Sequence, residues 1–120
     1  MRLLDLQYGD LREERDAFEA RHRGLLTRIA QLDVFADLEG VLAAIAACEG
    51  VVTTSNVLAH LAGALGAPTR LVYLAGREPF HYWVPGADGR SPWYPSVEIV
   101  TDQAWSSWEP ALEAVASRLR

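Results

Sequence analysis

Three small polar residues and a nearby imidazole form the stretch of the chain best suited to bind an anion. Thr54, Ser55 and Asn56 end or follow the β-branched run 51–54, and His60 comes four residues after Asn56. A β-branched run after a glycine predicts a short buried strand of a parallel sheet, and Ser55 or Asn56 can cap the helix that follows. Because the first amides of a helix have no internal partners, this turn can hold a phosphate or diphosphate.

The helix expected after this turn covers residues 57–65 and ends through Gly66 and Pro68. Its apolar residues recur at helical spacing, which predicts one face packed on the sheet: Leu58, Leu61, Ala62 and Leu65. His60 lies about 200° round the helix from Leu58, at about 100° per residue, so we expect it to point away from the sheet near the helix mouth. The alternative is a structural turn, since most strand-to-helix turns with Ser or Asn caps bind nothing.

Elements on both sides of this turn alternate between strands and helices. The pattern predicts strands at 2–7, 25–29, 51–54, 69–74 and 97–100, with helices at 11–23, 37–48 and 57–65 and a last helix capped by Ser106 or Ser107. The apolar residues expected inside the second and the last helix are Leu38, Val41, Leu42, Ile45 and Cys48, and Trp105, Trp108, Leu112, Val115 and Leu119. We therefore expect an α/β fold, a Rossmann-like parallel sheet with flanking helices, in a single domain over 1–120.

A long loop is expected at 75–96, rich in glycine, proline and aromatic residues. Loops of this length are usually functional or disordered, and the aromatic content argues against disorder. The loop begins at the carboxyl end of a strand, the sheet edge where ligands bind in open α/β folds. Trp83, Trp93 and Tyr94 are therefore candidate cleft aromatics. The alternative is that the aromatic residues cover an open edge of the core.

Composition excludes several classes of function. The 120 residues carry a net charge of −5 and 22% charged residues without a run of Lys or Arg, which argues against sequence-independent nucleic-acid binding. The single cysteine, Cys48, allows no intrachain disulfide or cysteine metal site, and its apolar surroundings predict a buried, inert thiol. No apolar run is long enough for a transmembrane segment, and the first residues lack a signal-peptide core, so we expect a cytoplasmic protein.

Three motifs occur in the order found in a known group of proteins: Leu-Gln-Tyr-Gly-Asp at 6–10, Ser-Asn-Val-Leu-Ala-His-Leu-Ala-Gly-Ala-Leu-Gly-Ala-Pro at 55–68, and Ser-Pro-Trp-Tyr-Pro-Ser at 91–96. On these motifs the chain resembles the bacterial glycosyltransferases associated with tetratricopeptide repeats, distant relatives of the ADP-heptose:lipopolysaccharide heptosyltransferases. The resemblance implies the C-terminal, nucleotide-sugar-binding domain of a GT-B fold. It also implies a nucleotide-sugar donor as substrate, with no metal and no separate cofactor.

The same resemblance suggests where a donor would bind. Its diphosphate would lie at Ser55, Asn56 and Val57, beside Thr54 and His60, and the nucleoside would approach Gln7, Tyr8 and Asp10. Heptosyltransferases have glycine where this chain has Val57, and a Val side chain makes close backbone approach to a phosphate harder. The family's N-terminal acceptor domain and the first strand of its donor domain have no counterpart here, and no catalytic base is evident.

Two functions remain open. The first is a glycosyltransferase-like domain that binds the donor and needs an acceptor domain, on a separate polypeptide or elsewhere in a longer product, for glycosyl transfer. The second is a non-catalytic, truncated α/β module for protein association. The missing strand leaves a sheet edge open. Under either function, this edge favours a homodimer or a complex with a partner.

Overall fold

The computed structural model describes residues 1–76 and 78–119, so Arg77, within the predicted loop, lies outside the described residues. The chain forms two compact units, Met1–Ala44 and Ile45–Arg120. The division into two compact units does not test whether residues 1–120 form a single domain, which stays a prediction. The first unit contains β1 (Leu3–Leu4), α1 (Arg12–Arg21) and β2 (Leu26–Thr27), and α2 (Leu38–Ala46) spans the boundary.

The first unit has a two-stranded parallel sheet in which Leu3 pairs with Leu26. Both strands are much shorter than the predicted ranges 2–7 and 25–29. Asp5 accounts for the end of β1, because its Oδ1 accepts a hydrogen bond from the backbone N–H of Gln7 at 2.9 Å and turns the chain. Its Oδ2 accepts from Nε of Arg15 at 2.5 Å, which anchors α1 beside the strand.

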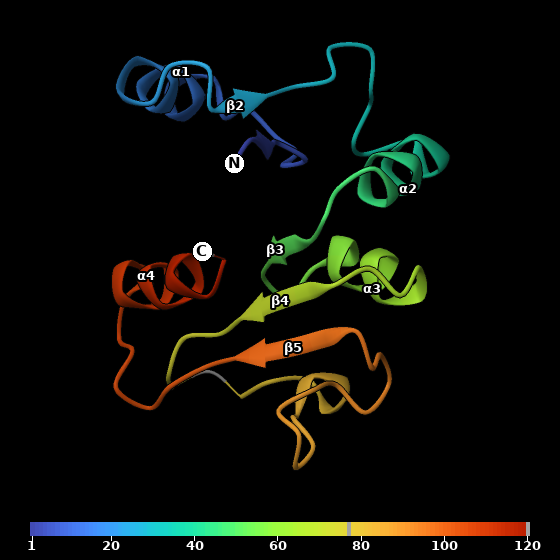
Figure 1. Ribbon diagram of the computed structural model, residues 1–120, viewed down its shortest axis with the longest axis vertical. Coiled ribbons are helices and arrows are strands. Elements are labelled where there is room, and N and C mark those ends of the chain that lie inside the picture. The colour runs from blue at the N-terminus through green and yellow to red at the C-terminus, as the bar shows by residue number, and fades with distance from the viewer. Residues whose placement is uncertain (77, 120) are drawn as a thin grey trace. The chain divides into compact units, whose positions relative to one another are not determined.

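The second unit contains a three-stranded parallel sheet in the order β3-β4-β5 (Figure 1). Its elements are β3 (Val51–Thr53), α3 (Val57–Ala64), β4 (Thr69–Val72), the 3₁₀ helix η1 (His81–Trp83), β5 (Val97–Val100) and α4 (Trp108–Arg118). The α/β fold with parallel sheets and flanking helices is thus confirmed. All three strands point the same way, so their carboxyl ends, and the turns after β3 and β4, lie along one edge of the sheet.

Alternate residues of β4 and β5 face two different hydrophobic clusters. One face packs on α3 and the aromatic loop, through Ala59, Leu71, Trp83, Val97 and Ile99. The opposite face packs on α4, through Val72, Val100, Ala111 and Val115, with Trp105 and Leu74 at its margin. The sheet is therefore covered on both sides.

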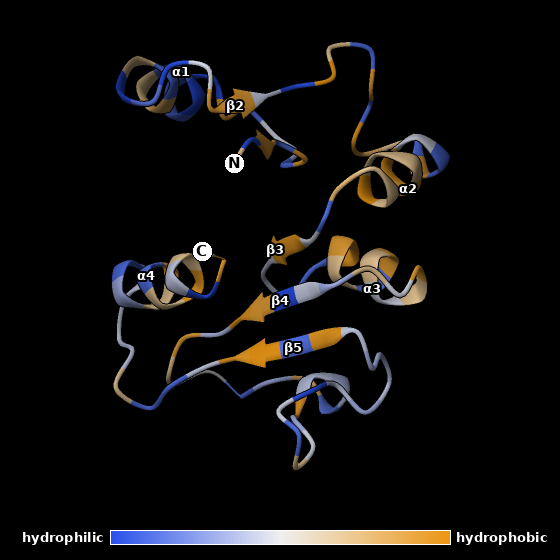
Figure 2. Ribbon diagram, in the orientation of Figure 1, coloured by the Kyte–Doolittle hydropathy of each residue, from blue (hydrophilic) through white to orange (hydrophobic). Residues whose placement is uncertain are grey.

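The face that packs on α4 also carries a group of charged side chains. Glu98 accepts a hydrogen bond from Nη1 of Arg118 at 2.8 Å and pairs with Nε of Arg70 at 3.5 Å. Figure 2 shows a hydrophilic segment of β4 beside one of β5, each followed by a hydrophobic carboxyl end. The ion pairs thus fasten the C-terminal turn of α4 to the sheet.

The inward faces of the helices differ from the prediction in several places. In α3 the fully buried residues are Ala59, Ala62 and Gly63, whereas Leu65 is 46% exposed, because small residues let the helix lie close to the loop. In α4 Val115 is buried as predicted and Ala111 joins it. Other residues that were predicted to lie in the core are exposed: Leu38, Val52, Trp108, Leu112 and Leu119.

The predicted loop 75–96 is ordered by its own hydrogen bonds and contains η1. Ser91, which is buried, organises its second half: its hydroxyl donates to the carbonyl of Tyr82 at 2.8 Å and accepts the N–H groups of Trp93 and Tyr94, each at 3.2 Å. Arg90 then forms an antiparallel bridge to Glu98. The loop is therefore joined to the edge strand β5 and packs on one face of the sheet.

Candidate functional site

The turn between β3 and α3 is shaped by Asn56, which is the N-cap of the helix. Its backbone is extended, with φ −156°, and its Oδ1 accepts the N–H groups of Leu58 at 2.9 Å and Ala59 at 3.4 Å. The hydroxyl of Thr53 lies 3.2 Å from the same oxygen and stabilises it. Of the two predicted caps, Ser55 and Asn56, it is Asn56 that caps the helix.

This cap leaves the amides just before and at the helix start unused. The backbone N–H groups of Ser55, Asn56 and Val57 donate no hydrogen bond to any residue that the structure describes. Val57 is 56% exposed and Ser55 is also exposed, whereas Asn56 is half-buried. The turn therefore presents three adjacent donors at the positive end of a helix dipole.

The four described α-helices differ in the charge of their first turn. The first turns of α1, α2 and α4 hold Glu13 and Glu14, Glu39, and Glu109 respectively, whereas that of α3 holds no acidic residue. A carboxylate near a helix N-terminus neutralises the dipole and repels other anions. Among these helices, α3 is thus the one whose N-terminus remains suited to an anion.

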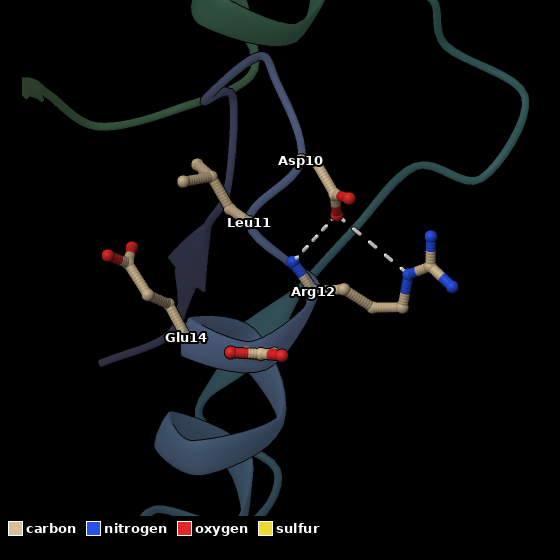
Figure 3. Close-up of a pocket in the computed structure, with 5 residues that line it drawn as sticks. Asp10, Leu11, Arg12 and Glu14 are labelled. Atoms are coloured by element: carbon tan, nitrogen blue, oxygen red, sulfur yellow. Dashed lines mark hydrogen bonds and ion pairs between the residues drawn. The ribbon is translucent and has the colours of Figure 1, made fainter.

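An open depression of about 470 Å³ lies at the start of α1 and illustrates the contrast (Figure 3). Three of its five lining residues, Asp10, Glu13 and Glu14, carry carboxylates, and Asp10 pairs with Nε of Arg12 at 3.9 Å. A phosphate entering this depression would meet more negative charge than positive charge. The negative charge of its lining therefore disfavours diphosphate binding in this depression, despite its size.

The predicted nucleoside contacts belong to the first unit. Gln7, Tyr8 and Asp10 are exposed, and the Tyr8 ring lies 6.1 Å from that of Phe35. Arg15 donates from Nη2 to the Gln7 carbonyl at 2.9 Å, which fixes the turn after β1. That these three residues contact the same ligand as Ser55 stays a prediction.

His60 lies within a group of aromatic rings. Its Nδ1 is 2.9 Å from the hydroxyl of Tyr94, and its ring centroid is 4.8–4.9 Å from those of Trp83 and Tyr82. The residue is half-buried and joins α3 to the loop. A role for His60 in binding the donor stays a prediction, and its observed contacts are structural.

The three candidate cleft aromatics have different surroundings. Trp83 is fully buried, so its assignment to a cleft wall is wrong: its large ring fills the core, and its Nε1–H donates to Oγ of Ser55 at 3.1 Å. Tyr94 is half-buried against Gly63. Trp93 is 63% exposed and is thus the candidate whose ring a ligand can reach most easily.

Tyr73 is a residue of the site that the sequence reasoning missed. It follows β4 at the sheet edge that carries the Ser55 turn, and its buried hydroxyl has no hydrogen bond of good geometry to a described residue. Burial raises the pKa of Tyr73, and the nearby Ser55 side chain and Phe80 backbone offset part of that effect. The sequence feature that could have identified Tyr73 as a site residue is its position just after a central strand.

The chain is thus an α/β protein with parallel sheets, in which Asn56 caps the N-terminus of α3 and no acidic residue stands in the first turn of that helix. It is similar to Protein FlbA of Caulobacter vibrioides (strain ATCC 19089 / CIP 103742 / CB 15), with 36% identity over 118 residues. The alignment covers 98% of this chain and 19% of that protein, so the chain spans about a fifth of this relative's length. No family model and no solved structure matches the chain. None of the described helices is long and apolar enough to span a bilayer.

Proposed function

We propose that this chain is a glycosyltransferase-like domain that binds the diphosphate of a nucleotide-sugar donor at Ser55, Asn56 and Val57. The observation that supports the proposal best is the arrangement of the α3 N-terminus: Asn56 caps Leu58 and Ala59, while the three preceding amides have no partner among the described residues. The motif resemblance at residues 55–68 supports the same positions independently.

The chemistry available at this turn suits a diphosphate without a metal. Three N–H groups, the Ser55 hydroxyl and the helix dipole can all stabilise negative charge, and no acidic residue stands in the first helical turn. Each hydrogen bond to a charged oxygen contributes about 1.5–3 kcal/mol. In glycosyl transfer the same groups would stabilise the charge that develops on the leaving diphosphate.

Transfer to an acceptor would need groups beyond this turn. The similarity covers a fifth of a much longer protein, which supports a setting in which an acceptor domain lies on the same or a separate polypeptide. A homodimer is the other arrangement that could complete the site. We propose a cytoplasmic location, where nucleotide sugars are available, and identify no catalytic base.

An association module is the alternative, and α4 favours it. Trp108, Leu112 and Leu119 are 43%, 50% and 39% exposed, and each is separated from the next by about one or two helical turns. Exposed apolar residues in such a row are typical of a protein contact. Under this alternative the Ser55 turn would bind no nucleotide.

Val57→Glu distinguishes the two functions. The side chain is exposed, so the change leaves the core intact and places a carboxylate in the first turn of α3, where it should stabilise the helix by about 0.3–1 kcal/mol. Calorimetric titration with UDP, GDP and ADP should show saturable binding of one nucleotide by the natural chain and loss of that binding in the variant. Leu112→Glu on α4 is the control with the same change in charge and should bind normally. Absence of binding by the folded natural chain would contradict the proposed function.

A further inference from the structure

We draw no further inference here: the strongest candidate, the exposed aromatic surface patch that Phe80, His81 and Trp93 form around η1, rests on its exposure alone, and nothing in the part of the chain that the structure describes shows what covers it.

Discussion

Gly63 controls how closely the aromatic loop approaches α3, and its replacement by alanine is the most informative stability test. A Cβ at this position would lie 2.5 Å from Cγ and 2.7 Å from Cδ1 of the Tyr94 ring. Both distances are far inside van der Waals contact, and the opposing atoms belong to a ring held by the His60 hydrogen bond. The ring must therefore move, and its contact with His60 must weaken.

The expected magnitude combines three effects. Overpacking costs about 1–3 kcal/mol, and the weakened hydrogen bond costs about 1 kcal/mol. Alanine recovers about 1 kcal/mol of helix propensity relative to glycine. We expect Gly63→Ala to lower the free energy of unfolding by about 2 kcal/mol, which corresponds to a fall in Tm on the order of 10 °C.

Urea and thermal unfolding, followed by circular dichroism, measure this change, and a double variant identifies its cause. In a Tyr94→Ala background the clash is absent, so Gly63→Ala should become neutral or stabilising by up to about 1 kcal/mol. A Gly63→Ala single variant as stable as the natural chain would refute the close packing of α3 on Tyr94. Equal destabilisation in both backgrounds would refute the assigned cause.

Three further predictions concern the loop, the phenol and the ion pairs. Ser91→Ala removes a buried hydroxyl that makes three hydrogen bonds, so unfolding free energy should fall by about 1–3 kcal/mol in a urea titration; an unchanged midpoint would contradict its role in the loop. Because burial raises the pKa of Tyr73 above its ordinary value of 10.0, its contribution to stability is complete below that value and is lost as pH rises through the raised pKa. Tyr73→Phe should therefore flatten the loss of stability as the pH rises above 10.0, and an identical pH profile would contradict the assignment. Glu98→Gln should cost at most about 1 kcal/mol, with the difference shrinking in 1 M salt, since its pairs with Arg70 and Arg118 are partly exposed; a cost that ignores salt would contradict this.

Local patterns in the sequence predicted correctly the elements that depend on local conformational preference. β5 begins and ends where its alternating apolar residues predict, and Asn56 caps α3 as its side chain allows. β1 is shorter than predicted because Asp5 turns the chain toward Gln7 and binds Arg15, a partner ten residues away.

Contacts between distant residues account for what the sequence did not reveal. The buried face of α3 is set by Tyr94, which lies far along the chain and requires a residue without a side chain at Gly63. Trp83 lies 28 residues from the serine that accepts its N–H, and no periodicity links the two. In the sequence, Tyr73 looks like one more apolar residue at the end of a strand. Its proximity to Ser55 is evident only in the folded structure.

The central claim is that the open amides of Ser55, Asn56 and Val57 bind a diphosphate. Amide-resolved NMR of the ¹⁵N-labelled chain, titrated with UDP, GDP and ADP, tests it most directly. The predicted result is saturable shifts that are largest at these three amides. Saturable shifts that leave these three amides unchanged, or no shifts from a folded chain, would contradict the claim.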